Sequence, residues 1–425
     1  MKPLLIKNGR VVDPASGLDA RRDVLIEDGR ISAIDTAVDR TQAEVLDATG
    51  LVVAPGFMDI HVHLREPGKE GAETIVTGTR AAAAGGFTAV ACMPNTQPVN
   101  DNPMVTRFIL GQAAQAGPVH VYPIGAVTKN SAGEELAEIE SLRAAGAVAV
   151  TDDGRPVASA RHLRRALEYC RALDIPLIDH CEDPTLAGGG VMHEGEWSLR
   201  LGLRGIPALA EELPVARNAR LAAETGARVH IAHLSTRASL ATVRLAKREG
   251  IRITCEVTPH HFTLTDEACR DFDTRTKMNP PLRSADDVAA LIEGLADGTV
   301  DAIASDHAPH SETEKQVDFE SAPFGIIGLE TALALTLDKL YHAGKISLLR
   351  LVELFSTGPA RALGLPGGRL QVAAPADLTL FDLERRWTYQ VAAGLSKSRN
   401  SPFDGWTFRG CAVATIVAGQ VIVRR

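Results

Sequence analysis

Eight short apolar runs alternate with amphipathic helical stretches between residues 55 and 365, and this alternation constrains the fold more than any other feature of the chain. Strands separated by helices lie parallel in one sheet, with the helices packed against its faces. The eight runs are GFMDIHVHL, FTAVACMP, VHVYPIGAV, AVAVTDDG, PLIDHCED, RVHIAHLS, IRITCEVTPHH and DAIASDHAP. Eight such units predict an α/β fold of the (β/α)₈ TIM-barrel type. An open, doubly wound sheet is the alternative, because periodicity alone does not show that the sheet closes.

The two ends of the chain have a different pattern, with short β segments separated by turn residues. Asn8-Gly9 and Asp28-Gly29 are hairpin signals between alternating apolar residues, and Gly419 marks a turn near the C-terminus. We therefore expect both termini to form one small β-sandwich domain. The predicted division is 1–54 and 366–425 for this domain and 55–365 for the barrel.

Net charge and cysteine usage restrict the partners and the compartment. The chain has 45 Lys and Arg against 53 Asp and Glu, so its net charge of −8 offers no general attraction to nucleic acid or to an anionic membrane. The six cysteines are scattered without a CxxC pair, and the N-terminus lacks the apolar segment of a signal peptide. We expect a cytoplasmic protein with a small-molecule substrate, and any anionic substrate must be bound by local cations.

Polar side chains that can bind metal lie where the predicted strands end. His61 and His63 end the first strand, and because side chains alternate along a strand, both point the same way. The other strand-end candidates are Asp152 and Asp153 on the fourth strand, His180 on the fifth, His233 on the sixth and Asp306 on the eighth. Barrel active sites form at this end of the strands, so four histidines and two carboxylates are expected to converge there.

Mixed imidazole and carboxylate ligands suit Zn²⁺, and six ligands are more than one tetrahedral ion needs. Two ions that share one carboxylate would use the whole set. Spacing alone does not choose between Asp152 and Asp153 as the shared ligand. A single strand-end histidine is more often an ordinary hydrogen-bonded residue, and we expect this of five histidines outside the set, His120, His162, His193, His230 and His342.

Several motifs resemble those of dihydroorotases, in the amidohydrolase superfamily. The motifs are DIHVHLREPG (59–68), MPN (93–95), EVTPHHF (256–262), KMNPPLR (277–283), ASDHAPH (304–310) and APFGIIGLET (322–331). The resemblance extends along nearly the whole chain and is closest to the bacterial class with the longer chain. It implies the reversible cyclisation of N-carbamoyl-L-aspartate to (S)-dihydroorotate in pyrimidine biosynthesis.

Carried over to this chain, the resemblance implies a two-zinc centre. His61, His63 and Asp306 would bind one ion, and His180 and His233 the second. Asp153 would bridge the two ions, where many superfamily members have a carboxylated lysine. An aspartate bridge leaves the occupancy of both sites open, so we expect two zinc ions per chain with one of them weakly bound.

The resemblance also implies the mechanism and the substrate contacts. Metal-activated hydroxide would attack the ring amide, with Asp306 as general base and then general acid. Arg65 would bind the substrate carboxylate, although an arginine at this position could instead form a surface salt bridge. The other implied substrate contacts are His63, Asn95, Asn279, His310, and the backbone at Phe324 and Gly325.

Three alternatives remain at this stage. The chain could be a hydantoinase, dihydropyrimidinase or allantoinase, although Arg65 and the aspartate bridge argue against these. It could also be a non-catalytic partner of aspartate transcarbamoylase, although such relatives typically lack metal ligands. The segment 311–325 is either a lid over the site or a static loop. A homodimer and a complex with aspartate transcarbamoylase are the assemblies that the resemblance suggests.

Overall fold

Two sets of parallel strands form most of the wall of a barrel in the computed structural model, which describes residues 2–424. The first set is β6 (Phe57–Val62), β7 (Phe87–Cys92) and β8 (His120–Pro123). The second set is β9 (Leu177–Asp179), β12 (Val229–Ile231), β13 (Ile253–Val257) and β14 (Ala302–Ile303). All of these pairings are parallel, as the alternation of strands and helices predicts.

Single backbone bridges join the two sets and close the ring. Val150 pairs with Gly125 after β8 and with Leu177 in β9, so the fourth predicted run fills the gap between the two sets. On the other side Val62 pairs with His307, and the amide of His63 donates to the His307 carbonyl at 2.8 Å. The (β/α)₈ barrel is confirmed, and the open-sheet alternative is excluded.

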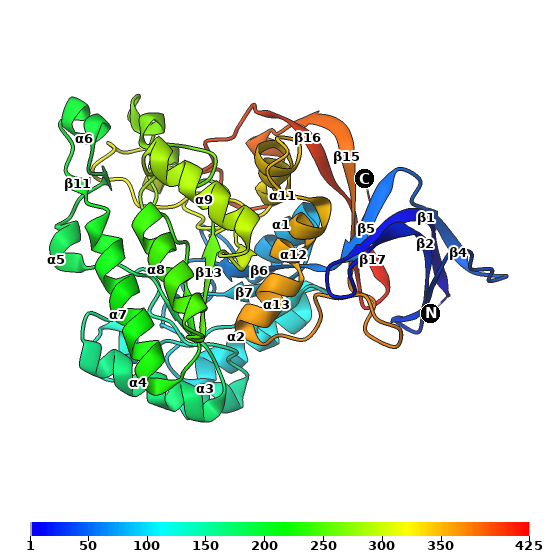
Figure 1. The fold of residues 1–425 in the computed structure, drawn as a ribbon, viewed down its shortest axis with the longest axis horizontal. Helices are drawn as coiled ribbons and strands as arrows, with labels where there is room; N and C mark the ends of the chain where they lie inside the picture. Colours follow the sequence, from blue (N-terminus) through cyan, green and yellow to red (C-terminus); the bar gives the residue numbers. More distant parts are fainter. Residues whose placement is uncertain (1, 425) are drawn as a thin grey trace.

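Helices surround the barrel wall (Figure 1). The longer ones are α1 (Ile75–Gly85), α2 (Pro103–Ala116), α3 (Ile139–Ala145), α4 (Ala160–Leu173), α7 (Leu209–Thr225), α8 (Arg237–Arg248), α9 (Ala285–Asp297), α12 (Leu348–Phe355) and α13 (Thr357–Leu363). Shorter elements are α5 (Pro184–Ala187), β10 (Met192–His193), α6 (Glu196–Leu201), β11 (Gly205–Ile206), α10 (Glu312–Lys315) and α11 (Ala332–Thr336).

Helix α8 shows how the sequence sets these elements. The Thr236 hydroxyl accepts from the Ser239 amide and caps the helix, while Leu240, Val243 and Ala246 bury one face against the barrel. A smaller set of side chains fills the barrel interior: Ile60, Ala91, Ile124, Ala149, Ile178, Ala232 and Ala304. The strands are thus packed on both sides and keep their C-terminal ends in fixed positions.

Both ends of the chain build a separate β-domain, which lies to one side of the barrel in Figure 1. Its strands are β1 (Leu4–Asp13), β2 (Leu18–Glu27), β3 (Arg30–Asp35), β4 (Glu44–Asp47), β5 (Leu51–Pro55), β15 (Leu378–Thr388), β16 (Thr407–Val417) and β17 (Gln420–Arg424). Strand β5 pairs antiparallel with β15 and so joins the two ends in one sheet around a shared apolar core. The predicted small β-domain from both termini is confirmed.

One local prediction in this domain is wrong. Asn8-Gly9 does not form a hairpin turn but lies inside β1, where the register with β2 shifts between Ile6 and Gly9. Asn8 has φ of 66°, a backbone conformation that asparagine tolerates in a bulge as well as in a turn. Asp28-Gly29 does form the predicted turn between β2 and β3.

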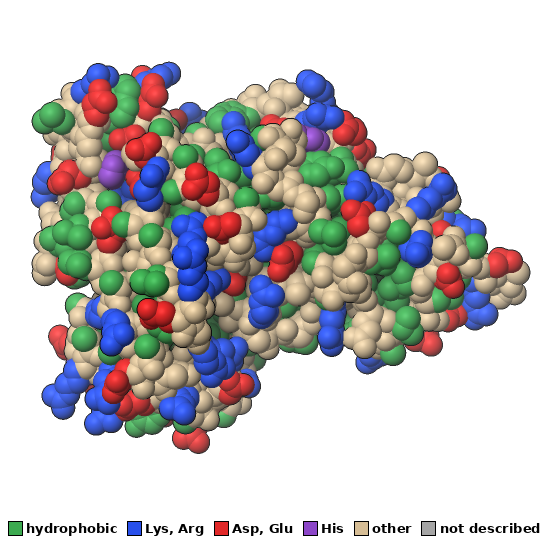
Figure 2. All heavy atoms as spheres, in the orientation of Figure 1, with side chains coloured by type: hydrophobic (Ala, Val, Ile, Leu, Met, Phe, Trp, Pro, Cys, Tyr) green, Lys and Arg blue, Asp and Glu red, His purple; other side chains and the backbone are tan. Residues whose placement is uncertain are grey.

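Figure 2 shows acidic and basic side chains interspersed over the visible face of the molecule. Among the described residues, no helix has both the length and the apolar character that a membrane crossing requires.

Candidate metal centre

The six predicted ligands converge at the C-terminal mouth of the barrel, and all six are buried. They form three overlapping groups whose ligand atoms lie within 4.8 Å of one another. These are His61, His63 and Asp153; Asp153, His180 and His233; and His61, His233 and Asp306. His61, His233 and Asp153 each belong to two of these groups, and of the three only Asp153 has two carboxylate oxygens with which to contact two ions.

Several polar atoms at this point are buried without a hydrogen-bond partner among the described residues. Nε2 of His61 and Oδ1 of Asp153 lie 3.5 Å apart, and both lack a partner. Nε2 of His233 also lies 3.5 Å from the same Asp153 oxygen. Buried polar atoms are costly when unsatisfied, and imidazole with carboxylate is a donor set for a divalent metal. The residues present therefore fit a metal ion.

The two adjacent aspartates on the fourth strand face different directions. Oδ1 of Asp152 accepts hydrogen bonds from the amides of Val127 and Thr128 at 2.8 and 3.1 Å, and the Thr128 hydroxyl donates to the other oxygen. Asp152 therefore ties its strand to the loop after β8. Asp153 faces the histidines, with His63 Nε2 at 3.6 Å and His180 Nδ1 at 3.7 Å.

Asp306 is held as a carboxylate at the edge of the centre. Its Oδ1 lies 3.1 Å from His63 Nε2 and 3.4 Å from His61 Nε2. Burial would raise the pKa of Asp306, but these imidazoles outweigh burial and hold the pKa well below its ordinary value. Asp306 and His233 have positive φ, 44° and 29°, a strained conformation that clusters at functional sites.

A cavity of about 310 Å³ opens beside the six ligands, and Arg65 is its unpaired cation. The residue is only 7% exposed, and its Nε donates to the Pro309 carbonyl at 3.1 Å. Among the described residues no carboxylate lies within ion-pair distance of the guanidinium, although burial makes an unpaired charge costly. Arg65 therefore does not form a surface salt bridge here and is available to an anion in the cavity.

The other predicted contact residues also line this cavity, except Gly325. His63 Nδ1 meets Oδ1 of Asn95 at 2.8 Å, and Asn279 Nδ2 donates to Glu182 Oε2 at 3.0 Å. Oδ1 of Asn279 is buried and has no hydrogen-bond partner within residues 2–424. The Gly325 amide donates to the Lys277 carbonyl at 2.9 Å, so this backbone donor is already engaged within the protein.

His310 is neutral at the rim of the cavity. Burial and the nearby Arg65 lower the pKa of His310 to about 3. Its Nε2–H accordingly donates to the Phe324 carbonyl at 2.9 Å, while the Phe324 ring lines the cavity. The Phe324 carbonyl is therefore also engaged, which differs from the predicted backbone contact to substrate.

Two lysines fasten the segment 311–325 over the cavity. Lys277 Nζ donates to the carbonyls of Phe319 and Glu320, both at 2.8 Å. Lys315 Nζ donates to Thr274 and Pro323 carbonyls at 2.9 and 2.7 Å, and burial lowers the pKa of Lys315 to about 7. The segment thus covers the site in a conformation fixed by buried ammonium groups.

Two residues in the layer below the predicted ligands have contacts that the sequence did not predict. Glu256 of β13 contacts His61 and His230, which was expected to be ordinary. Burial would raise the pKa of Glu256, but the two histidines outweigh it and hold the pKa at about 2, so Glu256 is a carboxylate. The available signal was one glutamate in the buried strand ITCEV and one histidine in the buried strand VHI.

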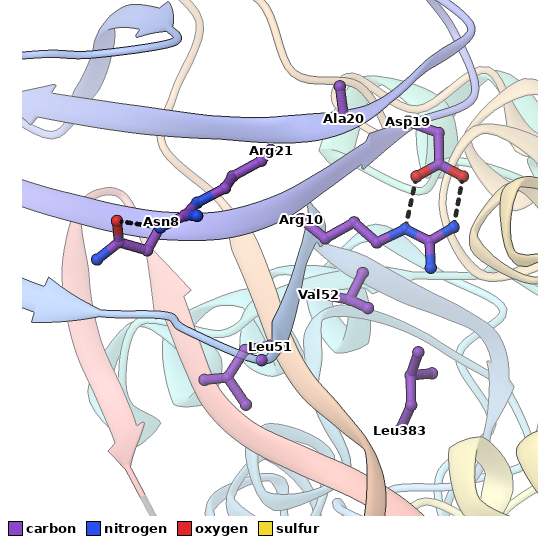
Figure 3. A pocket seen from close by; sticks show the side chains of 9 residues that line it. Asn8, Arg10, Asp19, Ala20, Arg21, Leu51, Val52 and Leu383 are labelled. Atoms are coloured by element: carbon purple, nitrogen blue, oxygen red, sulfur yellow. Dashed lines mark hydrogen bonds and ion pairs between the residues drawn. The ribbon is translucent and has the colours of Figure 1, made fainter.

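A second cavity, of about 480 Å³, lies on the β-domain (Figure 3). Arg10 and Asp19 face each other there through two hydrogen bonds of 2.7 and 2.8 Å, Arg21 donates to the Asn8 side chain at 2.7 Å, and Leu51, Val52 and Leu383 add apolar wall. Both arginines of this cavity are exposed and have side-chain acceptors, in contrast to the buried Arg65.

Comparison with known proteins gives relatives over the whole chain. A family model described as "Dihydro-orotase-like" matches residues 50–239. A dihydroorotase of Solibacter usitatus is 57% identical over 417 residues, covering 98% of this chain and 97% of the relative. A dihydroorotase of Syntrophotalea carbinolica is 55% identical and covers 99% of both chains.

Solved structures share the fold. The L-hydantoinase (dihydropyrimidinase) of Arthrobacter aurescens matches with a TM-score of 0.90 at 28% identity, covering 100% of this chain and 96% of that one. A D-hydantoinase (dihydropyrimidinase) of Thermus sp. matches with a TM-score of 0.83 at 26% identity, covering 99% and 95% of the two chains. The barrel and the β-domain therefore belong to one shared architecture.

Proposed function

The chain belongs to the dihydroorotase family, and from this we propose which residues interconvert N-carbamoyl-L-aspartate and dihydroorotate. The protein is a cyclic amide hydrolase of pyrimidine biosynthesis. Hydrolysis opens the ring amide of dihydroorotate, and synthesis closes it with loss of water.

We propose a two-zinc centre in which His61, His63 and Asp306 bind one ion. His180 and His233 would hold the second ion, and Asp153 would be shared by both. The support is the shared Asp153 and the unpartnered buried atoms around it. When bound, the ions supply Lewis acidity at the ring carbonyl and lower the pKa of the attacking water.

Asp306 is the proposed proton carrier. As a carboxylate it accepts the proton of the attacking water in hydrolysis, and it returns that proton to the ring nitrogen that leaves. In synthesis the same proton moves in the opposite direction. One carboxylate can serve both steps because a base that has taken up the proton becomes the acid, and Asp306 both contacts the ligand imidazoles and lines the cavity.

One observation carries the substrate assignment: the Arg65 guanidinium is buried beside the cavity without a carboxylate partner among the described residues. Dihydroorotate differs from uncharged cyclic ureides by one carboxylate, and a buried guanidinium can bind a carboxylate through two parallel hydrogen bonds. A ring without this group would leave Arg65 buried without a counter-charge. His63, Asn95, Asn279 and His310 complete the proposed contacts, together with the backbone at Phe324 and Gly325 once those groups exchange their present partners.

The test is turnover of four rings by the purified, zinc-supplemented protein: dihydroorotate, dihydrouracil, hydantoin and allantoin. We expect turnover of dihydroorotate alone, and its loss after chelation. Preference for another ring would overturn the role of Arg65 but not the metal centre. No turnover of any ring would favour a scaffolding role beside aspartate transcarbamoylase.

We further propose that residues 1–54 and 366–425 form the β-domain and 55–365 the barrel. We also propose a cytoplasmic homodimer, open to a complex with aspartate transcarbamoylase. The sequence resemblance supports these assemblies, and light scattering of the protein alone and mixed with a transcarbamoylase tests them.

A further inference from the structure

Glu256 lies directly behind the metal centre with its carboxylate between two imidazoles. It is 1% exposed, and its Oε1 lies 2.6 Å from His61 Nδ1. Its Oε2 lies 3.1 Å from His230 Nε2. A carboxylate only accepts hydrogen bonds, so each of these imidazole nitrogens carries a proton.

The contacts from Thr254 through His230 and Glu256 to His61 determine which nitrogen of each imidazole carries the proton. His230 carries a proton on Nε2, and its Nδ1 lies 2.8 Å from the Thr254 hydroxyl, which can donate to it. With its proton on Nδ1, neutral His61 has its lone pair on Nε2, the nitrogen that faces Asp153 and Asp306. This is the tautomer that a metal ligand requires.

The same carboxylate also reaches the other half of the centre. The His233 amide donates to Glu256 Oε1 at 3.4 Å, and the Leu234 amide donates to the Glu256 carbonyl at 2.9 Å. His233 is the residue with φ of 29°, so Glu256 supports the strained turn that presents its ring.

The remaining three ligand imidazoles have no carboxylate on the nitrogen that faces away from the centre. His63 meets the amide oxygen of Asn95, and His180 Nε2 lies 3.4 Å from the Asn279 amide nitrogen. Nδ1 of His233 has no hydrogen-bond partner among the described residues. A carboxylate partner makes an imidazole a better electron donor than an amide partner does, which singles out His61.

We propose that Glu256, supported by His230, is a positioning residue that fixes the tautomer and raises the basicity of His61, and so sets the affinity of the centre for its metal. This inference rests on the proposed function, because it takes His61 to be a metal ligand. Glu256 does not line the cavity, so its effect reaches the reaction through the metal and not through substrate contact.

The test measures the dissociation constant of Zn²⁺ by competition with a chromophoric chelator. For Glu256→Gln we expect affinity to fall about 10- to 100-fold, the usual cost of losing a partner behind a metal-bound histidine. His230→Gln should have the same direction and a smaller effect, of roughly threefold to tenfold, because Glu256 remains. The absorption spectrum of the Co²⁺-substituted protein should also change in Glu256→Gln.

Glu211→Gln is the matched control. Glu211 is equally buried and accepts hydrogen bonds from Ser235 and Thr236, but it touches none of the six ligands. Its variant should lose stability and keep its Zn²⁺ affinity and Co²⁺ spectrum. Wild-type affinity in both Glu256→Gln and His230→Gln would overturn the inference. If the wild-type protein itself bound no Zn²⁺, the proposed function would fail instead, so the two failures are distinct.

Discussion

The cavity at the barrel mouth and the cavity on the β-domain are both lined by arginine, but Arg65 and Arg10 differ in burial and in pairing. On the β-domain, Arg10 is paired with Asp19, and their side chains are 47% and 26% exposed. At the mouth, Arg65 is buried and unpaired among the described residues, and several neighbouring polar atoms lack partners. The β-domain cavity is the larger, at about 480 against 310 Å³. Unsatisfied buried charge, and not volume, therefore identifies the site.

Asp306→Asn, at the barrel mouth, should have the largest effect on turnover, while a matched change in the β-domain cavity should have none. Turnover of dihydroorotate should fall about a thousandfold, the scale of a lost general acid–base group, while most of the metal is retained through the amide oxygen. Steady-state kinetics and elemental analysis measure the two quantities. Asp19→Asn, in the other cavity, is the control and should leave turnover unchanged. Normal turnover in Asp306→Asn would refute its role.

Arg65→Ala should have the next largest effect. Loss of a charged hydrogen bond of about 2 kcal/mol corresponds to roughly a thirtyfold rise in KM for dihydroorotate. Dihydrouracil lacks the carboxylate, so its inhibition constant as a competitor of dihydroorotate should change little. Arg10→Ala supplies the comparison from the β-domain and should change neither constant. Equal effects of Arg65→Ala on both rings would remove the basis of the substrate assignment.

The lowered pKa of the buried Lys315 should make the free energy of unfolding depend on pH, which a surface lysine would not do. Its folded pKa of about 7 lies below its unfolded value, so above pH 7 the unfolded state binds more protons and stability rises with pH. Relative to Lys315→Met, the free energy of unfolding of the wild type should rise about 1 kcal/mol per pH unit from about pH 7.5 to 9.5.

The control for Lys315 is the exposed Lys129. Glu135 raises the pKa of Lys129, so this side chain stays charged over the same pH range in both states. Lys129→Met should therefore show no pH-dependent difference from the wild type. Denaturant titrations at matched metal content measure the free energy of unfolding of all three proteins at each pH. Parallel plots of this free energy against pH for the wild type and Lys315→Met would contradict the lowered pKa of the buried Lys315.

Arg10→Ala should have the smallest effect. An exposed ion pair contributes less than about 1 kcal/mol even with good geometry, so the free energy of unfolding should change little. A loss well above this would show that the pair contributes more than an exposed ion pair does, and a change in turnover would show that the β-domain cavity is coupled to the barrel mouth. Thermal and denaturant unfolding beside the standard turnover assay are sufficient.

The barrel and the convergence of ligands could be predicted because both follow from local rules. The period-two alternation places His61 and His63 on one face of their strand, and parallel strands bring their C-terminal ends to the same edge. Which of Asp152 and Asp153 faces the histidines could not be predicted from spacing. It depends on which carboxylate accepts hydrogen bonds from the amides of Val127 and Thr128.

Other features could not be read from spacing. Asn8-Gly9 favours positive φ in a turn and in a bulge alike, and only the pairing of β1 with β2 decides which one forms. Glu256 and His230 lie on neighbouring strands and meet only because of their register. A single buried polar residue in an apolar strand indicates that a partner exists without identifying it.

The closure of the ring at Val62 and His307 also determines when the centre comes into existence during synthesis. His63 and Asp306 are 243 residues apart, so the histidine pair leaves the ribosome long before its acidic partner is made. A nascent chain that ends just before Asp306 contains the other five predicted ligands and a barrel wall that is not yet closed. We therefore expect activity to appear only once the eighth strand docks against the first, and chains that end before Asp306 to be inactive.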